Sequence, residues 1–469
     1  MNVLLVTLDT TRADALGCYG APGNPTPNLD GLAAEGTRFD LAIATAAVTP
    51  VSHASILTGL ENAAHGLRVL SGAGGHRLDE RVPTLATVLR ARGYATGAVH
   101  SAFPVSSYYG FQNGFDVFES VEGGLEDDGP HKTWDMMKYQ RRSDETTGIA
   151  LDFLERTRRP FFLWVHYWDP HDAARLPPRE RLPKVLTRPG QDGAQVPSRE
   201  LYEAEVSYVD SQLGRILELL RRRGELDRTI VVAVADHGEG LGDHGWDHHR
   251  ILYQEEIRVP MIVRAPDVRS AAGVPDLVRT VDLFPTVLDL LGIAAPEPVS
   301  GASLRGLMSG RSGKPRVAFA DQVNGYDRVS RIAAEHPLLD FLYCAMDKDW
   351  KLVYRPSRPE RSELYELARD PGERANLFAE RTEEARRLER ELARQAPWVT
   401  APYAKDDSPP GDRSLGALGA LGYAGDAGLP AAASIAWAWT CPDHPGERTA
   451  SRAPCRVCGG PPILLRKDG

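Results

Sequence analysis

The sequence lacks several features that would place it in a specialised class of proteins. No apolar run approaches the roughly 20 residues that a membrane-spanning helix needs. Basic residues are not in excess, since the formal net charge is -9, and this argues against a nucleic-acid partner. Cysteine is scarce, with 5 in 469 residues. The apolar fraction of 42% and the charged fraction of 25% are those of a soluble globular protein.

A secretory signal is also missing from the N-terminus. Such a signal combines a charged start, an apolar stretch and a cleavage site of small residues. Here the short apolar run at residues 3–8 is typical of a buried strand and leads directly to Asp9, so we expect a cytoplasmic protein. Cys18 and Cys344 stand alone and the other three cysteines lie near the C-terminus, which indicates no disulfide framework.

Strand and helix patterns alternate through the first two thirds of the chain. This alternation predicts an α/β fold with a doubly wound, mainly parallel sheet and helices on both faces. Strands are predicted at residues 3–8, 94–100, 161–166, 229–235 and 261–264. Helices are predicted at residues 82–92, 201–223 and 282–291, and a glycine follows each of them, as is typical of a helix C-cap.

The pattern changes near Pro315. Short strand-like runs at 316–319, 341–345 and 350–354 precede a charged helix at 380–395, which predicts a smaller C-terminal α+β domain. A Pro-, Gly- and Ala-rich stretch after it is typical of a linker. The predicted divisions are a large domain at 1–313, the smaller domain at 314–400, the linker at 401–435 and a Cys/His tail at 436–469.

Polar residues follow two of the predicted strands at their carboxyl ends, where ligands bind in doubly wound sheets. Asp9 and Thr10 follow the first strand, and Asp236 and His237 follow a later one. Thr49 lies at the start of a helix-like segment, where unpaired backbone N–H groups favour an anionic group. Singly, such residues are often helix caps. Together they predict a metal site beside a nucleophile.

At these residues the sequence resembles the sulfatases of the alkaline phosphatase superfamily, from residue 2 to about residue 425. The matching segments are 2–20 with its Leu-Gly-Cys-Tyr-Gly ending, 26–30, 52–59, 234–245, 252–255, 258–260, 282–286, 364–367, 370–373 and 376–377. The resemblance implies an alkaline phosphatase-like fold and a metal-dependent esterase for sulfate- or phosphate-type esters.

The nucleophile position departs from the sulfatase pattern. The sulfatase signature reads Cys or Ser, any residue, Pro, Ser, Arg, and its first residue is oxidised to formylglycine. The matching segment here is Thr49-Pro50-Val51-Ser52-His53. Threonine is not a substrate for that oxidation, so we expect no formylglycine. His53 stands where the arginine that steadies formylglycine would be, and we expect it to contact substrate.

Two further positions depart from the family. Thr10 replaces the second of two paired acids, and Ser101 replaces an expected lysine, with His100 beside it as a candidate substrate contact. A threonine ester has no second hydroxyl with which to eject sulfate, so water must attack the sulfur or phosphorus directly. That chemistry is ordinary for phosphoryl transfer. Related members of the superfamily that act on phosphodiesters use a threonine nucleophile.

The resemblance also implies roles for several histidines. His171 matches a histidine that binds the substrate oxyanion. His248 matches a residue that contacts the ester or protonates the leaving group, and His249 fills this role if the alignment shifts by one residue. His166 is interpreted as a core histidine.

The predicted metal ligands are Asp9, Thr49, Asp236 and His237. An imidazole ligand favours zinc or manganese, and a calcium site with His237 as an outer hydrogen-bond donor is the alternative. A second metal is compatible with the histidines left unassigned, which are His171, His248 and His249.

The tail has its own metal-ligand spacing. It pairs Cys441-x-x-His444 with Cys455-x-x-Cys458 and resembles the heavy-metal-binding module of metal ATPases and efflux proteins. This predicts a structural zinc site, and the alternative is a flexible tail with incidental cysteines.

For the whole chain we expect a hydrolase of phosphate diesters or phosphonate monoesters with a covalent Thr49 intermediate. The alternatives are a sulfatase without formylglycine and a non-catalytic ligand-binding relative. The expected partner is a small-molecule sulfate or phosphate ester.

Overall fold

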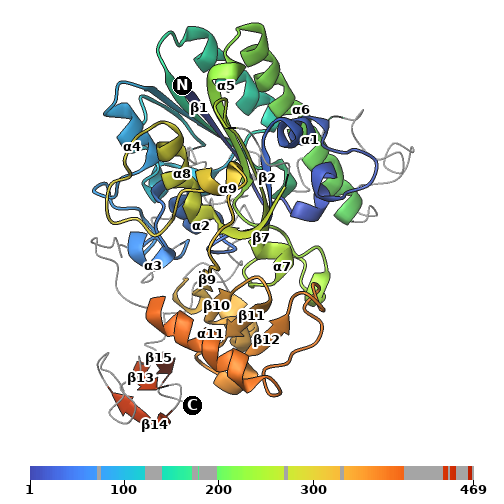
Figure 1. Cartoon of the computed structure of the whole chain (residues 1–469), viewed down its shortest axis with the longest axis vertical. Coiled ribbons are helices and arrows are strands. Elements are labelled where there is room, and N and C mark those ends of the chain that lie inside the picture. Colours follow the sequence, from blue (N-terminus) through green and yellow to red (C-terminus); the bar gives the residue numbers. More distant parts are fainter. Residues whose placement is uncertain are drawn as a thin grey trace, which may run out of the picture.

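The structure is a computed structural model, and it describes residues 1–70, 75–121, 140–171, 178, 198–268, 273–327, 332–395, 437–441, 444–449 and 463–466. Three sheets occur in these residues. Figure 1 shows the largest of them crossing the upper part of the molecule, with the second sheet below it.

Eight strands form the large sheet in the order β4-β3-β5-β1-β6-β7-β2-β8. Only β7 runs antiparallel to its neighbours, so the predicted mainly parallel sheet is confirmed. The strands are β1 (Asn2–Leu8), β2 (Thr37–Ile43), β3 (Ala95–His100), β4 (Val117–Glu119), β5 (Phe161–Tyr167), β6 (Thr229–Ala235), β7 (Arg258–Arg264) and β8 (Val274–Arg279).

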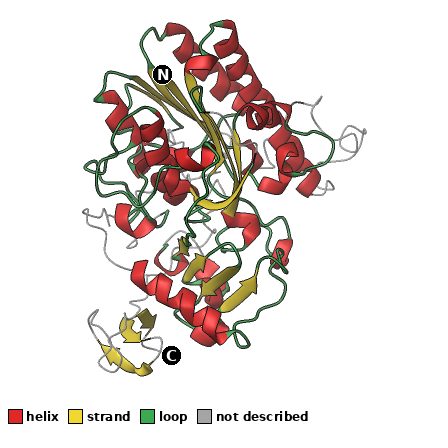
Figure 2. Cartoon of the chain, in the orientation of Figure 1, coloured by secondary structure: helices red, strands yellow, loops and turns green. Residues whose placement is uncertain are grey.

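The central strands β1, β5 and β6 are buried along their whole length, as apolar runs covered on both faces should be. Helices α1, α5 and α6 cover one face and α2, α4 and α8 cover the other, which completes the predicted double winding (Figures 1 and 2). These helices are α1 (Pro27–Glu35), α2 (Thr49–Thr58), α4 (Leu85–Arg90), α5 (Ser143–Arg156), α6 (Ser198–Arg222) and α8 (Leu283–Leu290). Shorter helices are α3 (Asn62–His65), α7 (Gln254–Ile257), α9 (Arg305–Met308) and α10 (Ile332–Glu335).

The antiparallel direction of β7 has a simple cause. A parallel partner for β6 would need a connection that runs from the carboxyl end of β6 back to the opposite end of the strands. The chain between β6 and β7 instead makes a loop and the short helix α7, and β7 begins at the same end of the sheet at which β6 finishes. This loop begins with Asp236 and His237, so the reversal gathers polar residues at one end of the sheet.

The smaller C-terminal α+β domain is also confirmed. Its four antiparallel strands have the order β12-β11-β10-β9, and α11 (Thr382–Gln395) packs on them through Leu388 and Leu392. The strands are β9 (Ala318–Gln322), β10 (Leu342–Met346), β11 (Trp350–Tyr354) and β12 (Glu363–Glu366). The predicted division between residues 313 and 314 falls between the two sheets. The predicted linker, 401–435, lies outside the described residues.

The tail contributes the third sheet, in which β13 (Trp437–Cys441) pairs with β14 (His444–Thr449) and β15 (Ile463–Arg466). Among the described helices, none combines the length and apolar character needed to cross a membrane.

Candidate active site

The two acids of the site follow adjacent parallel strands. β1 and β6 are paired in register, with Leu8 opposite Ala235, so Asp9 and Asp236 emerge side by side at the carboxyl edge of the sheet. His237 comes next in the chain. One ligand atom from each of these three buried residues lies within 4.8 Å of the others. The structure therefore brings together three of the four residues predicted to bind metal.

Thr49 is the fourth. It is the first residue of α2, where Pro50 suits the open N-terminal turn, and the helix ends at Gly59 with a left-handed φ of 69°. The Thr49 Oγ1 lies 3.3 Å from Asp9 Oδ2 and 3.2 Å from His237 Nε2. The predicted nucleophile thus faces two of the predicted ligands.

The proton on His237 can be assigned from its neighbours. His237 Nδ1 lies 2.9 Å from the carbonyl oxygen of Gly238, which can only accept a hydrogen bond. Nδ1 therefore carries the proton and Nε2 presents a lone pair toward Thr49. A histidine that binds metal has this arrangement, with its outer nitrogen hydrogen-bonded to a carbonyl.

The carboxylates fit a divalent cation. Asp9 Oδ1 and Asp236 Oδ2 are buried and accept no hydrogen bond from any described residue. Burial, reinforced by the carboxylates of Asp236 and Glu239, raises the pKa of Asp9 well above its usual value. Buried carboxylates in this state are costly unless a cation compensates them. Two carboxylates, one imidazole and one hydroxyl form a donor set that suits zinc or manganese.

Thr10, at the position of the missing second acid, contributes its backbone. Its φ of 46° is left-handed, a conformation that costs a non-glycine residue free energy. In it, the Thr10 N–H donates to Asp236 Oδ1 at 3.2 Å, and the Thr10 carbonyl accepts from the Tyr202 hydroxyl at 2.8 Å. The residue thereby orients a ligand instead of supplying one.

Three more histidines lie beneath the acids and are fully buried. His53 Nδ1 lies 2.7 Å from the Thr49 carbonyl and 3.5 Å from Asp236 Oδ2. His166 is buried as a core histidine would be, but its Nε2 lies 3.3 Å from Asp9 Oδ2. His100 packs against Trp164, with ring centroids 4.0 Å apart. Burial lowers the pKa of each imidazole, so all three are neutral at neutral pH.

A second group of histidines lies on the other side of His237. The ring of His249 is 4.7 Å from that of His237 and 5.1 Å from that of His171, and His171 stacks on Trp168. His249 is buried, whereas His248 is exposed. Sequence reasoning did not identify Glu239, whose Oε2 lies 3.6 Å from His249 Nδ1. Burial raises the pKa of Glu239 to about 8.

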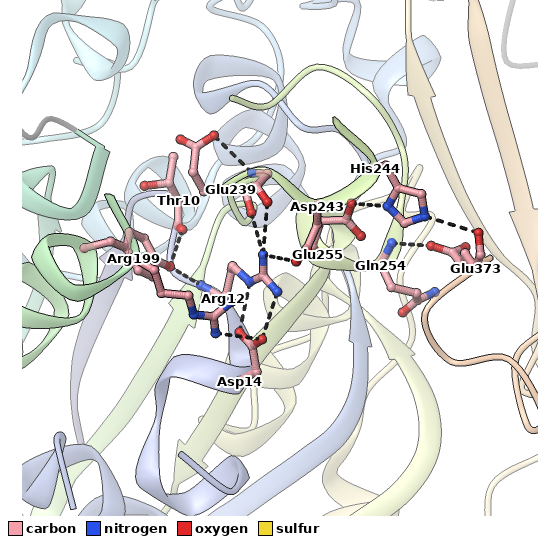
Figure 3. A network of polar contacts seen from close by, with 12 residues as sticks. Thr10, Arg12, Asp14, Arg199, Glu239, Asp243, His244, Gln254, Glu255 and Glu373 are labelled. Atoms are coloured by element: carbon pink, nitrogen blue, oxygen red, sulfur yellow. Dashed lines mark hydrogen bonds and ion pairs between the residues drawn. The ribbon is translucent and has the colours of Figure 1, made fainter. Parts of the chain in front are cut away.

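Arg12 was also missed, and Figure 3 shows why it matters. Its guanidinium binds the Asp14 carboxylate with two hydrogen bonds and the Asp243 carboxylate with one, at 2.8–2.9 Å. It also donates to the Glu239 carbonyl at 3.1 Å. Arg12 therefore connects the loop after β1 to the loop after β6 through hydrogen bonds. Its position three residues after Asp9 was the available clue in the sequence.

The loop after β6 also contacts the smaller domain (Figure 3). His244 Nδ1 lies 2.6 Å from Glu255 Oε1, and its Nε2 lies 3.2 Å from the Glu373 carbonyl. The smaller domain thus supports the loop that carries His248 and His249.

The structure describes less of the predicted tail site. Cys441 and His444 are backbone partners where β13 meets β14. Cys455 and Cys458 lie outside the described residues.

Comparison with known proteins agrees with this geometry. The sulfatase family model matches residues 1–293, and the model for the C-terminal part of N-sulphoglucosamine sulphohydrolase matches 242–397. An N-acetylglucosamine-6-O-sulfatase of Bacteroides thetaiotaomicron is 26% identical, over 80% of this chain and 82% of its own. A multifunctional alkaline phosphatase superfamily protein of Trinickia caryophylli is 27% identical, over 80% of this chain and 91% of its own.

Solved structures share the fold. The phosphonate monoester hydrolase of Agrobacterium radiobacter superposes with a TM-score of 0.64 at 23% identity, over 85% of this chain and 95% of its own. Because the sulfatase model covers more than half of the sequence, and the strand-end acids lie together in the structure, the chain belongs to the sulfatase family.

Proposed function

We propose that this sulfatase-family hydrolase cleaves phosphate diesters or phosphonate monoesters through a covalent bond to Thr49. One observation carries the proposal: at the helix position of the nucleophile there is a threonine hydroxyl, 3.3 Å from Asp9 Oδ2 and 3.2 Å from His237 Nε2. A hydroxyl needs such partners to become a nucleophile. A divalent ion bound by Asp9, Asp236 and His237 would lower the pKa of this hydroxyl and offset charge on the transferred group.

The residues suggest two balanced steps. In the first, Thr49 Oγ passes its proton to Asp9 Oδ2, 3.3 Å away, and bonds to phosphorus, while the bond from phosphorus to the leaving oxygen breaks. The leaving oxygen takes up a proton from a nearby histidine. Burial lowers the pKa of His249 well below its usual value and so disfavours its protonated form, which makes the exposed His248 the better source. In the second step, water passes a proton to the histidine that protonated the leaving oxygen and attacks phosphorus, the bond to Thr49 breaks, and Thr49 takes its proton back from Asp9.

The relatives support both substrate classes. The Bacteroides protein is named a sulfatase, and the Agrobacterium structure is that of a phosphonate monoester hydrolase. The phosphorus esters are favoured because a threonine intermediate has no second hydroxyl with which to expel sulfate. Transfer to sulfur through Thr49 is the second candidate.

Turnover of three aryl esters with one shared leaving group tests the proposal. Metal-loaded protein should hydrolyse the phosphodiester and the phosphonate monoester faster than the sulfate. Thr49→Ala should lower kcat by a factor on the order of 10³ or more, while Thr49→Ser keeps part of the activity. Thr58→Ala, at the other end of α2, is the matched control. Unchanged turnover in Thr49→Ala would overturn the nucleophile, and faster sulfate turnover would make the protein a sulfatase.

We also propose that Thr49 is not converted to formylglycine and that the tail binds zinc. Mass spectrometry of the peptide with Thr49 should give the mass of unmodified threonine. Replacing Cys455 and Cys458 with serine should remove one equivalent of zinc without changing ester turnover.

A further inference from the structure

A line of buried side chains leads from the core of the sheet to Asp9. Trp164 Nε1 lies 2.9 Å from Thr7 Oγ1, and Thr7 Oγ1 lies 3.0 Å from His166 Nδ1. His166 Nε2 then lies 3.3 Å from Asp9 Oδ2. All four side chains are fully buried. β1 and β5 produce the line, because Thr7 is paired with His166, and Trp164 lies two residues earlier on the same face of β5.

The direction of each hydrogen bond follows from chemistry. The indole N–H of Trp164 can only donate, so Thr7 Oγ1 accepts from it. Among the described residues, His166 Nδ1 is the one hydrogen-bond acceptor that the Thr7 hydroxyl contacts, so Thr7 donates to Nδ1. A neutral imidazole carries one proton, and here it lies on Nε2, which is 3.3 Å from Asp9 Oδ2. The contact between them is electrostatic and does not have the geometry of a hydrogen bond.

The opposite tautomer is unfavourable at this place. A proton on Nδ1 would turn the lone pair of His166 Nε2 toward the negative Asp9 Oδ2. It would also leave the Thr7 hydroxyl proton without its acceptor in the line. An unpaired buried polar group of this kind costs free energy. Trp164 and Thr7 therefore select the state of His166 in which an N–H group, and not a lone pair, lies beside the Asp9 carboxylate.

We propose that Trp164, Thr7 and His166 form a relay that fixes the proton on His166 Nε2 and so holds Asp9 in its metal-binding orientation. His166 acts here as a positioning residue. The inference rests on the proposed metal site, since it concerns how one ligand of that site is oriented. Asp9 Oδ2 lies 3.3 Å from both His166 Nε2 and the Thr49 hydroxyl, whereas Asp9 Oδ1 has no hydrogen-bond partner among the described residues.

Manganese affinity tests the relay directly. The apo full-length protein is titrated with Mn²⁺, and the EPR signal of the free ion gives the Kd. Mn²⁺ is the probe because the thiolates of the tail prefer softer metals. Thr7→Val keeps the shape of the side chain but removes the hydroxyl, and Thr7→Ser restores it. We expect Thr7→Val to weaken binding by about 10- to 100-fold, as loss of a partner behind a metal ligand does, and Thr7→Ser to restore most of it.

Two variants of His166 provide a second, independent test if Thr7→Val does not fold. The amide nitrogen of glutamine can occupy the place of Nε2, whereas that of asparagine lies nearer the place of Nδ1. His166→Gln should therefore bind Mn²⁺ more tightly than His166→Asn. A purely structural role would lower the thermal midpoint of both variants and leave no such difference in Kd.

The outcomes separate the relay from the metal site. If Thr7→Val and His166→Asn bind Mn²⁺ as tightly as the native protein, the relay is refuted and the metal site stands. Asp236→Asn is the control for the site. If the native protein binds no Mn²⁺, or if Asp236→Asn binds it equally well, the metal site itself fails and the relay fails with it.

Discussion

Replacing Arg12 with methionine should loosen the loop that carries Asp236 and His237. Methionine keeps much of the apolar stem but removes every donor. The Glu239 carbonyl then loses a charged donor at 3.1 Å, which costs about 1–3 kcal/mol. The Asp14 and Asp243 side chains are 51% and 38% exposed, so losing each ion pair costs about 1 kcal/mol or less. The expected loss of unfolding free energy is about 3 kcal/mol.

Urea unfolding at neutral pH measures this loss, and Mn²⁺ titration of the same samples shows whether the loop shift reaches the metal site. Arg199→Met is the matched control, because Arg199 binds the same Asp14 carboxylate at 3.0 Å but is 38% exposed. We expect it to cost about 0.5 kcal/mol or less. If Arg12→Met lost less than about 1 kcal/mol, or no more than Arg199→Met, the idea that Arg12 joins the two loops would be wrong.

Two other predictions concern a buried acid and a buried histidine. Burial raises the pKa of Asp169 to about 6 from 3.8, so folding favours its protonated form. The resulting stability is complete below pH 4 and is lost as the pH rises through 6, so Asp169→Asn should remove a pH dependence of up to about 3 kcal/mol in urea unfolding at pH 4 to 7. His53 uses Nδ1 toward Thr49 and Asp236, so His53→Asn should keep more Mn²⁺ affinity than His53→Gln. Equal affinities would contradict that assignment.

Much of the fold could be predicted because the periodicity of apolar residues is local. The continuous runs that became β1, β5 and β6 predicted buried parallel strands. The strands β2 and β8 were missed, because charged residues such as Arg38 and Asp276 interrupt their apolar pattern. The direction of β7 was not apparent, since the local pattern of a strand does not show at which end of the sheet the strand begins.

The residues of the candidate site were also predictable only in part. Asp9, Asp236 and Thr49 were predictable because each lies at the end of a strand or the start of a helix, where the backbone presents ligands. The sequence left open the choice between His248 and His249, and only the structure shows that His249 is buried and His248 exposed. Glu239 and Arg12 were missed, because their roles depend on contacts between loops that are far apart in the chain.

The sequence by itself determined the family, the double winding and the presence of threonine where the family pattern has its nucleophile, because these follow from residue types and their local order. Only the tertiary structure decided which side chains around Thr49 contact one another and which of their atoms carry protons. Thr7 and His166 are 159 residues apart, and their contact exists only because β1 and β5 pair in register. Burial then favours the arrangement of protons that pairs the buried donors with acceptors, because an unpaired buried polar group costs free energy.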